Sequence, residues 1–169
     1  MTIQPLAANE LVDVIDAAGR TVGVVSRREM RANRLPHRCT YVLVFNSRGQ
    51  LFIHLRTAIK DVYPSYWDIC VGGVLAAGET FDQGVVREIK EEIGVDAVVE
   101  KLFPFNFSDE RTIVQGMAYK AVHDGPFVLQ PEEIVRGEFA AIDEVLRRTR
   151  VDPFCPDGVE VLKRYLAGG

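Results

Sequence analysis

The chain lacks the features of several common protein classes. No stretch approaches the roughly 20 consecutive apolar residues that a membrane-spanning helix needs, so we expect no membrane span. Its three cysteines, Cys39, Cys70 and Cys155, are widely spaced and form no CxxC pair, which argues against a disulfide framework or a cysteine zinc site. Residues 1–10 have neither a basic segment nor a long apolar run, so we expect no signal peptide. These absences predict a cytoplasmic protein with reduced thiols.

The charge and composition of the chain exclude further classes of protein. The 20 Lys and Arg residues are outnumbered by 24 Asp and Glu, giving a net charge of −4, which argues against a broad nucleic-acid-binding face. Apolar residues make up 47% and charged residues 26%, as is typical of a folded globular chain and not of a disordered one. A chain of 169 residues buries about two thirds of its surface, so we expect a single domain over residues 1–169. A small phosphorylated ligand is compatible with this charge, because a metal ion can supply positive charge.

The order of helical and strand patterns predicts an α/β fold. Turn residues at 16–19 and 46–49 separate apolar runs and indicate two hairpins. Strands interspersed with helices favour a sandwich with helices on both faces of a sheet. We expect strands over residues 11–15, 21–25, 39–45, 51–55, 66–71, 98–107, 112–123 and 136–140, and helices over residues 27–33, 80–93, 142–148 and 157–166.

The helix over residues 80–93 has clear signals at both ends. Thr80 and Gln83 have the spacing of a capping box, and Gly94 supplies a left-handed stop. Four apolar side chains share an arc of about 100° that can pack on the sheet: Val85, Val86, Ile89 and Ile93.

Three acids lie close together on this helix. Glu88, Glu91 and Glu92 stand at positions i, i+3 and i+4, where like charges repel one another. A divalent cation relieves that repulsion, and an all-oxygen set of ligands suits Mg²⁺, Mn²⁺ or Ca²⁺ better than zinc. Taken alone, the same pattern also describes a solvated acidic helix face.

The surrounding segment resembles a known family. Residues 73–95 match every specified position of the Nudix box, G-x5-E-x7-R-E-U-x-E-E-x-G-U with U apolar. Seven fixed residues and two apolar ones match by chance with odds on the order of 10⁻⁹ to 10⁻⁸. The chain therefore resembles the Nudix hydrolases, and the expected elements around the box are similar to that family's α/β/α sandwich with a mixed sheet.

The resemblance implies a reaction and roles for individual residues. Nudix enzymes use divalent metal, here Mg²⁺ or Mn²⁺, to hydrolyse a pyrophosphate bond in a nucleoside diphosphate derivative or related diphosphate. The positions implied to bind metal are those of Glu88, Glu91, Glu92 and the Gly73 carbonyl. Glu79 and Arg87 occupy positions that orient the metal-binding carboxylates through a salt bridge. Dimers are common in the family, so a homodimer is a further expectation.

The residue that takes the proton from water is less clearly indicated. Glu91 or Glu92 is our first candidate, because a carboxylate beside a metal can accept the proton. Some family members use an acid outside the box, for which Glu133 and Glu110 are candidates here. Lys60 and Arg56 are candidates for substrate binding, since they are expected near the mouth of the site. His37 is a further candidate, although it is more readily explained as a structural histidine. Tyr63 and Trp67 are more readily explained as packing residues than as stacking platforms.

The flanks of the box suggest an alternative function. Segments at residues 12–16, 44–51 and 63–67 resemble the part of the superfamily that contains type I isopentenyl-diphosphate isomerase. That enzyme requires a Cys-Gly-His-Pro stretch before the box, whereas this chain has Gly72 and Gly73 there and Cys70 two residues upstream. The intact box favours a hydrolase. A non-catalytic ligand-binding module on the same scaffold is the third hypothesis.

Overall fold

A six-stranded mixed sheet forms the centre of the molecule. The computed structural model describes residues 6–169, and its elements in chain order are η1 Leu6–Asn9, β1 Leu11–Ile15, β2 Thr21–Ser26, α1 Arg27–Ala32, β3 His37–Phe45, β4 Leu51–Arg56, β5 Trp67–Asp68, α2 Phe81–Ile93, β6 Val99–Ser108, β7 Ile113–Val122, β8 Ile134–Ala140, α3 Ile142–Arg148 and α4 Pro156–Leu166. The strand order is β5-β4-β3-β7-β6, and β8 pairs with β4. β3 and β7 run parallel, while the other pairs are antiparallel.

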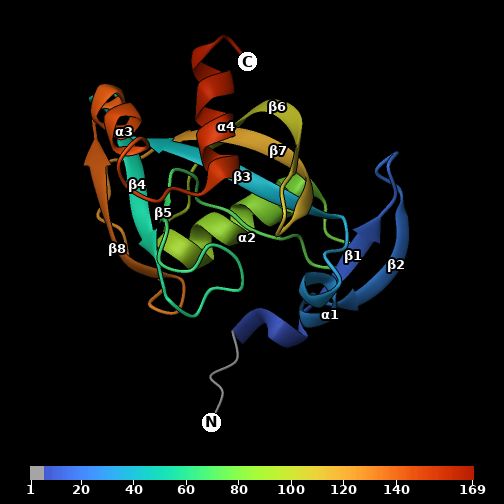
Figure 1. Cartoon of the computed structure of the whole chain (residues 1–169). Helices are drawn as coiled ribbons and strands as arrows, with labels where there is room; N and C mark the ends of the chain where they lie inside the picture. The colour runs from blue at the N-terminus through green and yellow to red at the C-terminus, as the bar shows by residue number, and fades with distance from the viewer. Residues whose placement is uncertain (1–5) are drawn as a thin grey trace.

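Helices cover both faces of this sheet, as Figure 1 shows. Side chains alternate between the two faces along a strand. In β3, Val42 and Val44 join the apolar cluster that contains residues of α2. Leu43 and Phe45 join the cluster that contains residues of α3 and α4. This arrangement confirms the α/β sandwich with a mixed sheet that the sequence predicts.

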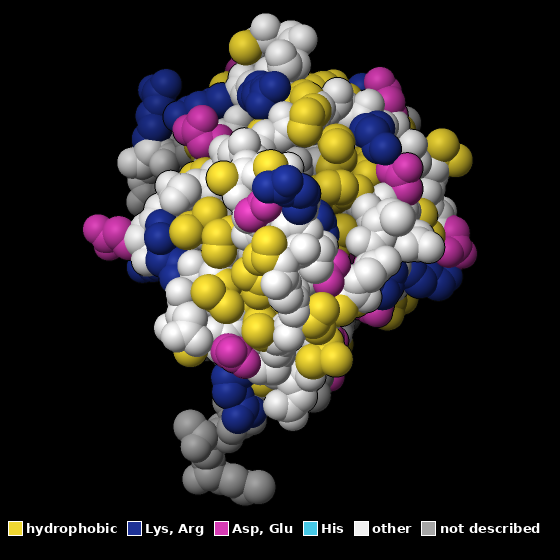
Figure 2. Space-filling model, turned by 90° about the vertical axis from the view of Figure 1, so that its right-hand side faces the viewer, with side chains coloured by type: hydrophobic (Ala, Val, Ile, Leu, Met, Phe, Trp, Pro, Cys, Tyr) yellow, Lys and Arg dark blue, Asp and Glu magenta, His cyan; other side chains and the backbone are white. Residues whose placement is uncertain are grey.

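A separate two-stranded ribbon lies beside the sandwich. β1 and β2 pair antiparallel through the turn at residues 16–19, as expected. Ser26 then caps α1 by accepting the Glu29 N–H at 3.2 Å. Figure 2 shows the side of the molecule on which this ribbon lies. Hydrophobic side chains are exposed on this side. Val22 and Val24 of β2 are among the exposed apolar residues.

Helix α2 has the ends that the sequence predicts. Thr80 Oγ1 accepts the Gln83 N–H at 3.2 Å, and Gln83 Oε1 accepts the Thr80 N–H at 3.0 Å. Gly94 ends the helix in the left-handed conformation, with φ +71°. Val86, expected on the apolar face, is 55% exposed. It lies at the far edge of the arc, about 100° from Val85, where the contact with the sheet has ended.

Two other expectations about strands are corrected by the structure. The expected strand over residues 66–71 is reduced to β5, because the Asp68 side chain accepts the Cys70 N–H at 3.0 Å and so competes with regular pairing. The expected second hairpin forms only at its closed end, where Phe45 pairs with Leu51. Beyond that point β4 pairs along its length with β8. The other expected elements lie within two residues of their predicted bounds, and η1 was not expected.

Two expectations concern membranes and export. Across residues 6–169, no helix is long and apolar enough to cross a membrane. The segment expected to lack a signal peptide, residues 1–10, lies partly outside the described residues.

The end of α2 also anchors the segment that follows β7. The Val128 N–H donates to the Ile93 carbonyl at 3.1 Å, and the Gln130 N–H donates to the Glu92 carbonyl at 2.9 Å. A Cβ at Gly94 would lie 3.0 Å from the Val128 Cβ and 3.1 Å from its carbonyl oxygen. Only glycine fits this contact without a shift of the backbone.

We therefore expect Gly94→Ala to destabilise the fold more than Gly49→Ala. Both glycines have positive φ, +71° and +76°, but no atom lies within 4 Å of a Cβ built at Gly49. The control substitution should cost about 1–2 kcal/mol for left-handed strain alone, and Gly94→Ala should add the cost of the clash with Val128. Urea denaturation measures both free energies of unfolding. Equal losses would show that the contact with Val128 is unimportant.

Candidate active site

The position of each acid around α2 determines how deeply it is buried. Val85 is fully buried against the sheet. At 100° per residue, Glu92, Glu88 and Glu91 lie about 20°, 60° and 120° from it around the helix. The order of exposure follows: Glu92 and Glu88 are 7% and 8% exposed, whereas the Glu91 side chain is 50% exposed. The face that packs on the sheet therefore carries two of the acids partly into the interior.

Burial favours the neutral forms of these two acids. It raises the pKa of Glu88 to about 7, against the opposing charge of Arg87. Burial, together with the negative charge of Glu88, also raises the pKa of Glu92 well above its usual range. Two carboxylates that are shielded from water and repel each other become stable as anions when a cation joins them.

Arg87 connects the acids of the motif to one another. Its guanidinium lies 3.1 Å from Glu79, 2.9 Å from Glu88 and 3.0 Å from Glu91. It also donates to the Val74 carbonyl at 3.3 Å. The structure thus contains the ion pair between Glu79 and Arg87 that the family resemblance implies, and this pair lies beside the buried carboxylates.

Two glycines bring the backbone close to the acids. The Gly72 N–H donates to Glu92 Oε2 at 3.2 Å. A Cβ at Gly73 would lie 3.1 Å from Glu88 Oε1, so a larger residue would press on that carboxylate. The Gly73 carbonyl accepts the Thr40 N–H at 3.0 Å, which leaves one of its two lone pairs for another partner.

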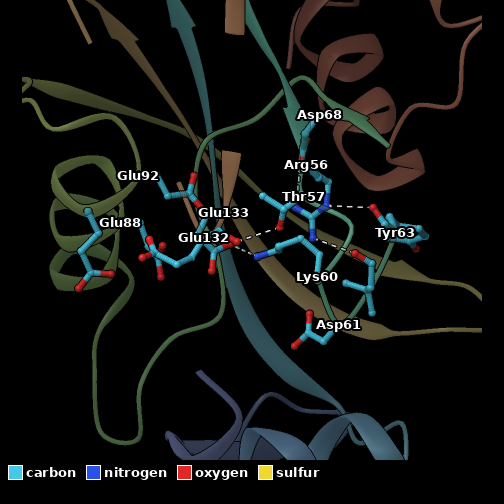
Figure 3. A network of polar contacts seen from close by, with 12 residues as sticks. Arg56, Thr57, Lys60, Asp61, Tyr63, Asp68, Glu88, Glu92, Glu132 and Glu133 are labelled. Carbon is cyan, nitrogen blue, oxygen red and sulfur yellow. Dashed lines mark hydrogen bonds and ion pairs between the residues drawn. The ribbon is translucent and has the colours of Figure 1, made fainter. Parts of the chain in front are cut away.

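These residues line one cavity together with side chains from distant segments. Gly72, Gly73, Arg87 and the three glutamates of α2 line it, and so do Glu10, Arg27, Lys60, Gln130 and Glu133. Lys60 and Glu133 form an ion pair. Figure 3 shows this pair facing Glu92. The structure therefore brings Lys60 and Glu133, both candidates from the sequence, to the acidic cluster.

Other candidates from the sequence lie elsewhere. Arg56 lines an adjoining cavity, where it contacts Asp68 at 3.2 Å. His37 is 1% exposed and lines none of the described cavities; its Nδ1 lies 2.9 Å from the Leu35 carbonyl oxygen. Burial lowers the pKa of His37 to about 4. Glu110 is exposed in the turn between β6 and β7 and lines neither cavity.

The aromatic candidates are both buried. The Trp67 ring stacks on Phe154 with centroids 6.3 Å apart, and Arg148 lies 4.3 Å from its centroid on one face. Tyr63 is 3% exposed, and its hydroxyl donates to Asp109. Tyr63 also lines the cavity that contains Arg56.

Several charged residues of the two cavities were missed by the sequence analysis. Arg27 and Arg31 both contact Asp61, at 2.7 and 3.2 Å. Asp68 and Asp157 lie in the adjoining cavity. None of these residues belongs to a sequence motif. Their role could not be predicted, because they come together only when distant segments pack in the fold. The one available signal was the position of Asp61 beside the candidate Lys60.

The acidic cluster is suited in residue type to a hard divalent cation. It offers carboxylate and carbonyl oxygens, the donors that Mg²⁺ and Mn²⁺ prefer. Within the part of the chain that the structure describes, no three His, Cys, Asp or Glu side chains converge as a complete set of metal ligands. Arg87 occupies carboxylate oxygens of Glu88 and Glu91, so binding of a cation would compete with these ion pairs.

Comparisons with known proteins show which family the chain resembles. A family model described as the NUDIX domain matches residues 35–163. The chain is 38% identical over 158 residues to the uncharacterised Nudix hydrolase PA4841 of Pseudomonas aeruginosa, covering 93% of this chain and 94% of that protein. It is 33% identical over 162 residues to the uncharacterised Nudix hydrolase YfcD of Escherichia coli K12, covering 95% and 89%.

A solved structure extends the agreement to three dimensions. DR0079 from Deinococcus radiodurans superposes with a TM-score of 0.78 and is 27% identical, covering 92% of this chain and 98% of that one. Sequence, fold and the arrangement of the box residues lead to one conclusion: the chain belongs to the Nudix hydrolase family.

Proposed function

We propose that the protein hydrolyses a pyrophosphate bond in a nucleoside diphosphate derivative or a related diphosphate, with a divalent metal bound at the acidic cluster. The observation that carries the proposal is the pair of buried carboxylates, Glu88 and Glu92, at a cavity that Arg27 and Lys60 also line. Carboxylates that a metal ion would stabilise thus lie beside the side chains of Arg27 and Lys60, which can bind phosphate. The likeness to the NUDIX domain of Shewanella oneidensis NrtR, solved in complex with ADP ribose, supports a diphosphate ligand for this fold.

The cation would be held by Glu88, Glu91, Glu92 and the Gly73 carbonyl. Mg²⁺ or Mn²⁺ bound there supplies positive charge that stabilises the developing charge on phosphate oxygens and lowers the pKa of the attacking water. Arg87 orients Glu88 and Glu91 from one side. The Gly72 N–H fixes Glu92 from the other.

The remaining steps fall to other side chains of the cavity. Arg27 and Lys60 bind non-bridging phosphate oxygens and hold the diphosphate against the acids. Glu91 or Glu92 takes a proton from water, and Glu133 is the alternative base, since it lines the same cavity. Lys60 holds Glu133 in place through their ion pair.

Two other functions suggested by the sequence receive less support. An isomerase would use a reactive thiol, but burial raises the pKa of Cys70 well above its usual range, which keeps the thiol protonated. A binding module would not require the whole set of acids. The homodimer stays a prediction.

A screen that separates and quantifies the phosphate monoesters formed, by anion-exchange chromatography, tests the proposed function directly. Nucleoside diphosphates and triphosphates, dinucleotides and nucleotide sugars are incubated with the protein, with Mg²⁺ or with a chelator. We expect metal-dependent hydrolysis of at least one class. No hydrolysis of any class, combined with tight binding of one ligand, would establish the binding module instead.

Glu92→Gln should remove most of the activity found in that screen and leave the fold intact. The amide keeps the shape of the side chain but cannot carry the negative charge, so we expect kcat to fall by about 100-fold or more. Glu91→Gln should also remove most activity, whereas Glu100→Gln, an exposed change on β6, is the matched control. Circular dichroism checks the fold. Wild-type turnover of both active-site variants in excess Mg²⁺ would show that these roles are wrong.

Mg²⁺ should stabilise the folded protein through the same acids. At a concentration 100 times its Kd, a ligand that binds only the folded state adds about 2.7 kcal/mol, or roughly 5 to 10 °C in Tm for a chain of this size. Because the pKa of Glu88 is raised to about 7, protons compete with metal below that pH. The rise in Tm should therefore be smaller near pH 6 than near pH 8. Glu88→Gln should reduce the rise at both pH values, and an undiminished rise would place the metal elsewhere.

A further inference from the structure

One carboxylate beside the acidic site holds two arginines of α1. Arg27 Nε lies 2.7 Å from Asp61 Oδ2, and Arg31 Nε lies 3.2 Å from the same oxygen. The three side chains are only 12 to 14% exposed. Although burial opposes ionisation, the charges of Arg27 and Arg31 hold the pKa of Asp61 well below its usual range. The cluster therefore combines two positive charges and one negative charge where little water can screen them.

Arg31 has two further acceptors, and both are neutral. Its Nη1 donates to Thr112 Oγ1 at 3.2 Å and lies 3.4 Å from His37 Nε2. The Leu35 carbonyl oxygen lies 2.9 Å from His37 Nδ1 and can only accept, so Nδ1 carries the hydrogen and Nε2 of the neutral ring accepts from Arg31. Burial, and then the charge of Arg31, lowers the pKa of His37 to about 4, which keeps the ring neutral at neutral pH.

These acceptors limit how Arg31 contacts Asp61. Arg31 reaches the carboxylate only through Nε, because His37 and Thr112 hold its Nη1. Arg27 contacts both oxygens, through Nε at 2.7 Å and Nη2 at 3.4 Å. Arg27 and Arg31 are one helical turn apart and repel each other. Without the contact to His37, Arg31 would be free to form the same two-point contact and to displace Arg27 from Asp61.

Arg27 keeps donors for a ligand. A guanidinium has five N–H donors, and contacts among residues 6–169 use two of those of Arg27, both to Asp61. Arg27 lines the acidic cavity and also the second cavity, which adjoins it. Asp61 thus binds one side of the guanidinium, and the other donors are available to phosphate oxygens.

The segment that carries Asp61 is fixed to the opposite wall of the acidic cavity. Figure 3 shows Asp61 next to Lys60, whose ion pair with Glu133 faces Glu92. The Thr57 N–H donates to the Glu133 carbonyl at 3.1 Å, and the Lys60 N–H donates to the Thr57 carbonyl at 3.4 Å. Asp61 therefore joins α1 to a segment whose place is already set by Glu133.

We propose that Asp61 and His37 are positioning residues for phosphate binding. Asp61 holds the Arg27 guanidinium in the cavity, and His37 holds Arg31 so that it does not displace Arg27. This inference rests on the proposed function, which places a phosphate of the substrate at Arg27. Neither positioning residue touches the substrate, and His37, a substrate-binding candidate from the sequence, acts only through Arg31.

The direction of one effect separates positioning from a simple effect of charge. Asp61→Asn removes a negative charge beside the cavity, so charge alone predicts tighter binding of an anion. Loss of the charge-assisted contact with Arg27 predicts weaker binding instead. Calorimetric titration with methylenediphosphonate, a diphosphate analogue whose P–C–P bridge resists hydrolysis, measures the Kd at a fixed Mg²⁺ concentration. We expect the Kd to rise about tenfold or more.

Two variants of His37 give a second measurement, which decides the matter where Asp61→Asn does not fold. His37→Leu removes the acceptor for Arg31, so the Kd should rise about threefold or more. His37→Gln offers both a donor and an acceptor, so its Kd should stay within about twofold of the wild-type value. A purely structural role of His37 would change the Tm of both variants without separating their Kd values. Circular dichroism identifies the variants that fold.

Asp96→Asn is the matched control, because the Asp96 side chain is 82% exposed and lines neither cavity; its Kd should equal that of the wild type. An unchanged or lower Kd in Asp61→Asn, equal Kd values in the two His37 variants, or no binding by the wild type at millimolar concentration would each overturn the inference. The expected order of Kd values supports it even when no diphosphate is hydrolysed, an outcome that rejects only the proposed function. Hydrolysis combined with unchanged or tighter binding by Asp61→Asn rejects only this inference.

Discussion

The site depends on one electrostatic constraint, the burial of two like-charged carboxylates on the same face of a helix. Glu88 and Glu92 lie next to the residues that pack α2 on the sheet, so the core holds them where water cannot stabilise their charge. Arg87 offsets part of this cost at Glu88. The remaining unfavourable energy is relieved when a proton or a cation binds to the carboxylates. Acids on a solvated surface have no such need, because water stabilises their charge.

Two glycines bring the backbone next to these acids. The Gly72 N–H donates to Glu92, and a Cβ at Gly72 would lie 2.2 Å from the Thr40 carbonyl oxygen; a Cβ at Gly73 would lie 3.1 Å from Glu88 Oε1. Beyond them, cationic residues of α1 and of the segment after β4 complete the cavity. The cationic side chains thus lie next to the carboxylates of α2. A diphosphate with its metal ion also contains both negative and positive charge.

The sequence was informative where the determining interactions are local. The capping box, Gly94 and the spacing of the acids all lie within residues 73–95, so the helix could be predicted from local sequence, and the resemblance to the family implied the Glu79–Arg87 pair. Predictions failed where tertiary contacts decide, as at Val86, which the sheet does not reach, and at residues 66–71, where Asp68 disrupts regular pairing. The second cavity was out of reach because its partners are far apart in sequence. Tyr41 and Asp157, for example, are separated by 116 positions.

The two functions of α2, packing and presenting acids, have a consequence for how its length can vary. Glu92 and Val85 point in nearly the same direction around the axis, and fixed caps stand at both ends of the helix. Inserting a single residue midway would turn everything after it by about 100°, moving the acids toward the apolar layer and turning Ile89 and Ile93 away from it. No adjustment at the caps can undo that rotation. Divergent forms of this protein should therefore differ in the length of their loops while the number of residues between Thr80 and Gly94 stays constant.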